Sequence, residues 1–169
     1  LGDTMHAAPG IGITAPHIGV SLRVVVLDLG DGAKTYVNPE IVWASPETIM
    51  HQEGSVSMPG VNDEVQRHAR VRISYHDLDG TTQHEESGGL RAVCHQHEID
   101  QLDGIFWIDR LSRLKRDRLI ARYNKLQRGG GAMRLARTSA VMLALVASIH
   151  VSNTAFGEGR RGWPGQARP

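Results

Sequence analysis

The residues best suited to chemistry lie in one short stretch, CHQHEIDQ, which runs from Cys94 to Gln101. His97, Glu98 and Gln101 occupy the first, second and last positions of an H-E-x-x-H pattern. In that pattern two histidines on one helix face bind a metal and the glutamate beside the first acts as general base. Because the last position here is glutamine, the stretch predicts a metal-binding helix that lacks one of its two histidines.

Composition predicts one ordinary soluble domain. The chain has 169 residues, of which 40% are hydrophobic and 22% charged, enough to bury a core. Nineteen basic and eighteen acidic residues give a formal charge of +1, which argues against nucleic-acid or membrane binding. Cys94 is the single cysteine, which excludes an internal disulfide and fits a reducing compartment. The chain starts at Leu1 without an amino-terminal signal sequence, so we expect a fragment of a cytoplasmic protein.

An antiparallel sheet is expected before the central helix. After a short helix over residues 1–8 and a glycine-rich loop or edge strand over 10–19, β-branched and alternating segments predict strands at 22–29, 35–44, 69–77 and 81–86. The Asp79-Gly80 pair predicts the hairpin turn between the last two strands. Residues 53–60 form a second glycine-containing stretch.

The central helix is expected to start after Ser87-Gly88-Gly89 and to end at Asp103-Gly104. A short strand over 105–108 and a helix over 112–127 are predicted to follow. The pattern indicates an α+β fold.

The character of the sequence changes after Arg128. Three glycines at 129–131 form a flexible joint, and the apolar run from 140 to 151 is too short for a membrane-spanning helix, which needs about 20 residues. Residues 129–169 are therefore expected to be a linker and an atypical extension, either an added amphipathic helix or an artefact, with a disordered tail from Arg160.

Three stretches in this order resemble the three signature motifs of peptide deformylases. They are GIGITAPH at 10–17, EGSVS at 53–57 and QHEIDQLDG at 96–104. Peptide deformylases are metal hydrolases that remove formyl from the first methionine of new proteins. The resemblance covers residues 1–128 and implies a deformylase-like domain, truncated at its start, with antiparallel sheets around the H-E-x-x-x helix and a carboxyl-terminal helix.

The resemblance also implies a metal site, but two of its ligands are replaced. The family holds iron or zinc through the cysteine of E-G-C-x-S and both histidines of H-E-x-x-H. Here Ser55 stands in place of the cysteine, His97 is kept, and Gln101 replaces the second histidine. A hydroxyl and a neutral amide are far weaker ligands than a thiolate and an imidazole. We therefore expect weak or absent metal binding and no deformylation by the ordinary metal-dependent mechanism.

The other family roles fall on matching positions. Glu98 corresponds to the general base, the backbone amide of Val56 to an oxyanion donor, and His17 to a glutamine that polarises the formyl oxygen. The implied partner is a peptide amino terminus of the formyl-methionine type. The residues expected to bind this peptide are Ile11, Gly12, Gly54, Leu90, Val93 and Cys94.

Several alternatives stay open for these residues. His17 and His97, with Glu98 or Cys94, would form a rebuilt metal site, whereas Cys94 as a pocket wall needs no metal. Ser55 would act as a nucleophile only with a histidine base within reach.

Two further residues have simpler expectations. Arg67 either pairs with Asp100 or contacts a peptide, and His95 is expected at the surface because it points off the metal face of the helix.

Two functional hypotheses follow. In the first, the chain is a divergent hydrolase of formylated or otherwise N-acylated peptides that uses Glu98 as general acid/base. In the second, it is a catalytically silent protein whose apolar pocket and Gly10 to Gly12 edge bind a peptide amino terminus by strand addition.

Overall fold

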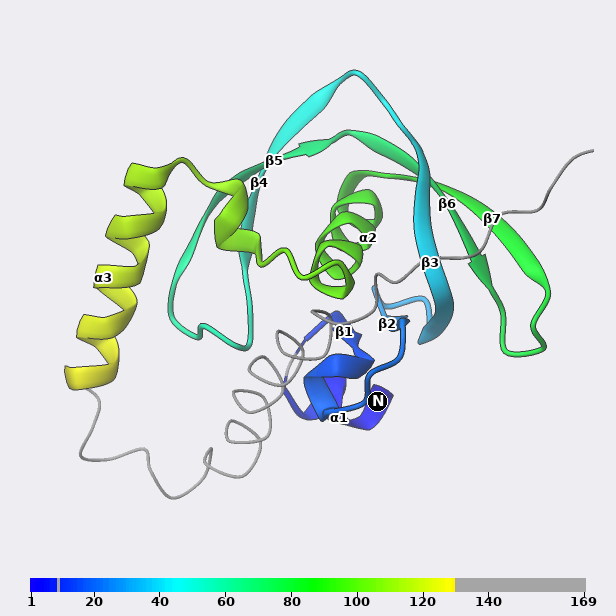
Figure 1. Cartoon of the computed structure of the whole chain (residues 1–169), viewed down its shortest axis with the longest axis horizontal. Coiled ribbons are helices and arrows are strands. Elements are labelled where there is room, and N and C mark those ends of the chain that lie inside the picture. The colour runs from blue at the N-terminus through cyan, green and yellow to red at the C-terminus, as the bar shows by residue number, and fades with distance from the viewer. Residues whose placement is uncertain (9, 130–169) are drawn as a thin grey trace, which may run out of the picture.

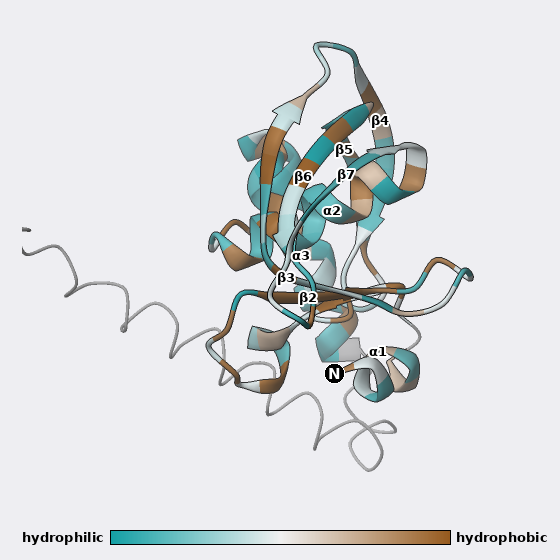
Figure 2. Ribbon diagram, turned by 90° about the vertical axis from the view of Figure 1, so that its right-hand side faces the viewer, coloured by the Kyte–Doolittle hydropathy of each residue, from teal (hydrophilic) through white to brown (hydrophobic). Residues whose placement is uncertain are grey.

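A five-stranded antiparallel sheet is the largest element of the computed structural model, which describes residues 1–8 and 10–129. Its strands lie in the order β1-β2-β3-β6-β7, so β1 and β7 form its two edges. The strands are β1 (Gly12–Thr14), β2 (Val24–Leu27), β3 (Lys34–Ala44), β6 (Arg70–His76) and β7 (Thr82–Gly88). Figure 2 shows hydrophobic residues along β2, whose sequence is VVVL. The predicted strands and the hairpin are confirmed, with ends shifted by a few residues.

The resemblance implied more than one sheet, but the strands of the second sheet were not predicted from the residues. This sheet consists of β4 (Thr48–Gly54) and β5 (Asn62–His68), which pair antiparallel along their whole length. Their sequences, TIMHQEG and NDEVQRH, are mostly polar and contain few β-branched residues. One face of this ribbon is exposed to solvent, so the strands lack the hydrophobic pattern by which strands are normally detected.

The central helix α2 (Gly89–Leu102) lies between the two sheets (Figure 1). It packs against strands of both sheets, and its buried side chains join Val71 and Ile73 of β6 in the main hydrophobic core. Gln96 anchors α2 to β5, since its amide accepts from the backbone N–H of His68 at 3.0 Å and donates to the carbonyl of the same residue at 2.9 Å. The predicted α+β arrangement around this helix is confirmed.

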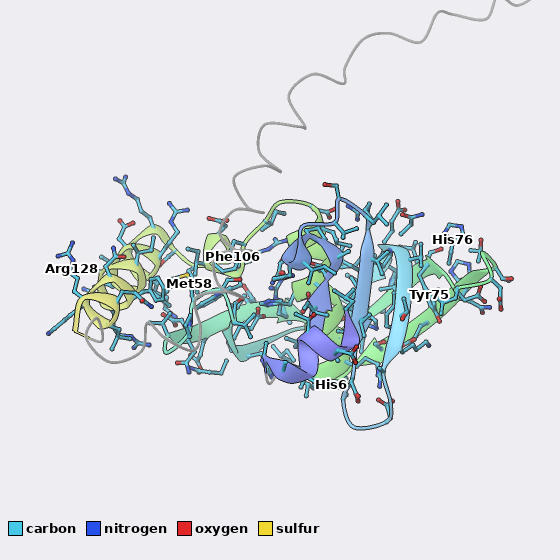
Figure 3. The ribbon with its side chains drawn as sticks, turned by 90° about the horizontal axis from the view of Figure 1, so that it is seen from below. His6, Met58, Tyr75, His76, Phe106 and Arg128 are labelled. Carbon is cyan, nitrogen blue, oxygen red and sulfur yellow. The ribbon has the colours of Figure 1, made fainter. Side chains whose placement is uncertain are left out.

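Two further helical segments follow α2. They are the 3-10 turn η2 (Trp107–Arg110) and α3 (Arg113–Gly129), which together with Met58 form a second core at the far end from Tyr75 (Figure 3). The predicted strand over 105–108 was wrong. The carboxylate of Asp109 accepts a hydrogen bond from the backbone N–H of Phe106 at 3.1 Å, which closes a helical turn there.

The amino-terminal segment forms a small layer of its own. Helix α1 (Gly2–Ala7) covers β1 with a third cluster of Met5, Ile13 and Val26, and the 3-10 turn η1 (Ala15–Ile18) follows β1. The predicted first helix is confirmed. None of the helices in the described part of the chain is long and apolar enough to cross a membrane. The extension was expected from residue 129, but Gly129 is the last residue of α3. The rest of that stretch lies outside the described residues.

His95 is buried, not at the surface as predicted. Its exposed fraction is 1%, its ring meets that of Tyr36 edge-on at 4.8 Å between centroids, and its Nε2 lies 3.4 Å from Oε1 of Glu85. Lys34 and Tyr36 also donate to Glu85, at 2.6 and 3.2 Å. The face of α2 opposite the metal motif is therefore packed on the large sheet through a polar cluster, which a helix-face argument without the sheet did not predict.

The contacts of Glu85 in this cluster predict that the folded chain loses stability in acid. Burial raises the pKa of Glu85, but the hydrogen bonds from Lys34 and His95 outweigh it and lower that pKa from 4.5 to about 2. The resulting stability is fully present above pH 4.5 and is lost as the pH falls toward 2, about 3 kcal/mol in all. Urea unfolding at pH 5 and pH 3 should show the larger part of this loss in the unmodified chain and much less of it in Glu85→Gln. Glu86→Gln, on the exposed neighbouring side chain, should behave like the unmodified chain.

Candidate functional site

A cavity of about 440 Å³ lies where β1, the end of β4 and α2 meet. The structure brings all the candidate residues together around it, although they come from three separate stretches of sequence. The lining includes Ile11, Gly12, His17, Gly54, Ser55, Val56, Leu90, Val93, Cys94, His97, Glu98 and Gln101. The three motif-like stretches therefore build one site.

A carboxylate that the sequence analysis did not assign holds His97. Glu53, at the end of β4, accepts from Nδ1 of His97 at 2.8 Å. Arg67 donates to both oxygens of the same carboxylate, at 2.6 and 3.0 Å. Burial raises the pKa of Glu53, but the hydrogen bonds from Arg67 and His97 outweigh it and lower that pKa to about 2. The ionised carboxylate fixes the proton of the His97 ring on Nδ1, which leaves Nε2 as an acceptor.

The side-chain amide of Gln101 forms a hydrogen bond to that acceptor nitrogen. Its Nε2 lies 2.7 Å from Nε2 of His97. Because the ring proton is on Nδ1, the amide must be the donor, and its NH₂ group points at the lone pair that a metal would need. The Gln101 amide thus takes the coordination direction of the one retained family ligand.

His17 is held in the opposite tautomer by Thr14, another residue that the sequence analysis did not assign. The backbone N–H of Thr14 donates to Nδ1 of His17 at 3.2 Å, and the Thr14 hydroxyl lies 2.6 Å from the same atom. The ring proton therefore sits on Nε2. Burial lowers the pKa of His17, against the hydrogen bond with Thr14, and His97 lowers it further. A neutral His17 with a proton on Nε2 is a hydrogen-bond donor and not a metal ligand.

Glu98 is an enclosed polar group of the cavity that lacks a hydrogen-bond partner. Only 6% of the residue is exposed, and its Oε2 has no hydrogen-bond partner within residues 1–8 and 10–129. Burial raises its pKa to about 7; His97 opposes the shift and Glu53 adds to it. Burial, followed by the charges of Glu98 and Glu53, also raises the pKa of the Cys94 thiol to about 12. Cys94 is therefore an uncharged wall residue at neutral pH, as in the metal-free alternative.

These residues do not fit an iron or zinc ion. Ser55 Oγ accepts from the backbone N–H of Ser57 at 3.2 Å, and the candidate nitrogens of His97 and His17 are engaged or protonated. Within the described residues no three side chains of the types His, Cys, Asp and Glu converge on a point that suits a metal ion. Stable zinc and iron sites need several such ligands with free lone pairs. The donor set matches neither the family site nor the rebuilt site.

Arg67 pairs with Asp100, the structural alternative of the two considered. Its Nη1 lies 2.5 Å from Oδ2 of Asp100, and Arg110 donates to both oxygens of that carboxylate. Arg67 therefore joins the second sheet to the last turns of α2 beneath the site.

Gly12 allows β1 to approach α2. A Cβ at this position would lie 2.5 Å from Oε1 of Glu98 and 2.8 Å from Cδ2 of Leu27, both enclosed side chains. Gly12→Ala is expected to destabilise the protein by about 1–3 kcal/mol through overpacking. Thermal unfolding measures this loss. Gly2→Ala, where a Cβ meets nothing within 4 Å, is the matched control and should leave stability unchanged or slightly raised.

Sequence reasoning missed Glu53 and Thr14 because each acts through a histidine. Thr14 and His17 are three residues apart, the spacing that lets one turn bring their side chains together, and this spacing was available in the sequence. Glu53 lay inside a motif-like stretch, but its contact with His97 spans 44 residues and depends on the unpredicted β4.

Comparisons with known proteins agree with the motifs. Residues 1–117 match the family model described as polypeptide deformylase. A Bradyrhizobium diazoefficiens protein named peptide deformylase-like is 80% identical over 129 residues, 75% of this chain and 76% of that protein. A peptide deformylase of Phenylobacterium zucineum is 48% identical over 128 residues, 73% of this chain and 76% of that protein. The crystal structure of a Legionella pneumophila peptide deformylase is similar with a TM-score of 0.70 and 38% identity, over 77% of this chain and 78% of that one. The chain belongs to the polypeptide deformylase family.

Proposed function

We propose that this chain binds peptide amino termini in its cavity without a metal ion and without the hydrolytic reaction of its family. One observation carries the proposal: the Gln101 amide donates to Nε2 of His97, at 2.7 Å, in the direction that a metal would need. A water molecule without a metal keeps a pKa near 16, so it is a poor nucleophile. Loss of the metal therefore removes the ordinary mechanism and leaves the binding surface.

That binding surface has the features that a peptide needs. β1 is an edge of the large sheet, and Gly12 on it lines the cavity, so an extended peptide has backbone groups to pair with. Val93 and Cys94 form an apolar wall, and Leu90 stands half-exposed at the rim. This surface favours the amino terminus of a peptide over nucleic acid or a membrane, and the cytoplasm, where new peptides are made, is the proposed compartment.

Calorimetry tests the proposal directly. The unmodified chain, in a buffer with a chelator, should bind Met-Ala-Ala-amide or its formylated form with one peptide per chain. Leu90→Asp, at a position 46% exposed on the rim, should weaken binding about tenfold. Leu78→Asp, at a position 80% exposed in the turn between β6 and β7, is the matched control and should bind normally. Absence of binding to both peptides would refute the proposal.

A divergent hydrolase is the second candidate, and Glu98 favours it. A carboxyl group whose pKa is raised to about 7 is suited to general acid/base catalysis near neutral pH. This candidate predicts stoichiometric metal and release of formate from formyl-Met-Ala-Ala-amide, with both the Val56 amide and His17 as oxyanion donors. Turnover in the unmodified chain that disappears in Glu98→Ala would establish it over the binding function.

A further inference from the structure

Among the described residues, one enclosed carboxyl group of the cavity has no arginine partner. Glu53 and Asp100 share Arg67, and Asp100 also binds Arg110. Glu98 forms no ion pair in the described part of the chain, and its Oε2 has no partner of any kind there. An enclosed carboxyl group without a partner is costly, and a cationic ligand would relieve this cost. The cavity is therefore matched to a positive charge beside Glu98.

The two substituted ligand positions add acceptors to the lining of the same cavity. With its NH₂ group turned to His97, the Gln101 amide has its carbonyl oxygen left over, and no donor from the described residues binds it. The Ser55 hydroxyl accepts one hydrogen bond, from the N–H of Ser57, and retains a second lone pair. A neutral amide oxygen and a hydroxyl are poor ligands for zinc. Together with a carboxylate, they are good acceptors for N–H groups. This set suits a cation that carries its own hydrogen-bond donors.

A primary ammonium group is such a cation. We propose that the cavity takes the free α-ammonium group of an unformylated peptide, with Glu98 as counter-ion and the Gln101 oxygen as a second acceptor. This inference rests on the proposed function and adds the chemical form of the peptide. The N–H on Nε2 of His17 then donates to the first carbonyl of the peptide, and Val93 contacts the first side chain. A formylated amino terminus carries no charge and leaves Glu98 unpaired.

Matched peptides test the inference on the unmodified chain in the presence of a chelator. Calorimetry compares Met-Ala-Ala-amide with formyl-Met-Ala-Ala-amide at one pH near neutrality. The free amine should bind about tenfold more tightly, as expected for a charge-assisted hydrogen bond to an enclosed carboxylate. Equal or tighter binding of the formylated peptide overturns the inference while the proposed function stands. Failure of both peptides to bind overturns the proposed function as well.

A variant and a third peptide assign the contact. Glu98→Gln keeps the size of the side chain and removes its charge, so it should abolish the preference for the free amine and leave the two peptides binding within about threefold of each other. Thermal unfolding verifies that this variant is folded. Persistence of the preference in folded Glu98→Gln overturns the role of Glu98. Acetyl-Lys-Ala-amide supplies an ammonium at a side-chain end, and binding as tight as that of Met-Ala-Ala-amide overturns the assignment to an α-ammonium group.

Discussion

Replacing Arg67 by alanine is expected to lower the free energy of unfolding by about 3–5 kcal/mol. The Arg67 side chain is 3% exposed, and it donates to both oxygens of Glu53 and to Asp100. Its removal leaves Glu53 enclosed with only the Nδ1 contact of His97, and leaves Asp100 with only Arg110. Equilibrium unfolding in urea at neutral pH measures the loss.

A surface pair of the same types provides the control for Arg67. Arg72 and Glu86 lie 2.9 Å apart with about half of each side chain exposed. Solvent screens such a pair, so Arg72→Ala should cost less than about 1 kcal/mol. Equal losses in the two alanine variants would show that the enclosed network contributes no more than a surface ion pair, which would contradict the expectation for Arg67.

The fold was largely predictable because its large sheet obeys simple patterns. The VVVL core of β2 and the alternation in β6 indicate strands from the residues alone, and Asp79-Gly80 indicates the turn. The second sheet was not predictable in this way. β4 and β5 pair with each other but expose one polar face, so their sequences lack the hydrophobic pattern that marks a buried strand. The error at His95 has a related cause, since a helix between two sheets has no solvent face at its middle.

That the candidate residues lie together was predictable, but the hydrogen bonds between them were not. The twelve candidate residues line one cavity, as motif order and resemblance implied. The protonation pattern depends on Glu53 and Thr14, whose contacts are set by β4 and by the 3-10 turn η1. A sequence shows that Gln101 is a weak metal ligand. Only the geometry shows that its amide donates to the retained histidine.

That geometry makes the two substitutions unequal. Gln101 acts on the retained ligand itself, because its amide occupies Nε2 of His97. Ser55 only lacks the thiolate that a cysteine at this position would supply. Ser55→Cys alone should therefore bind little metal, since the new thiolate finds His97 still capped, and Gln101→His alone supplies two imidazoles without a thiolate. Zinc sites with tight binding use three or four such ligands together, so the effects of the two changes should be strongly non-additive.

The Ser55→Cys/Gln101→His double variant is expected to take up about one zinc ion per chain where the unmodified chain takes up none. Glu53 already orients His97 through Nδ1, which is the outer contact that a metal-binding histidine requires. Elemental analysis after dialysis measures the content. Zinc at 100 times its dissociation constant should also stabilise the double variant against unfolding by about 2.7 kcal/mol, because an ion that binds only the folded chain shifts the equilibrium by mass action. Adding His97→Ala to the double variant should abolish both effects. Stoichiometric zinc in the unmodified chain that is lost in His17→Ala would instead establish a rebuilt site, and would refute the capping of His97 by Gln101.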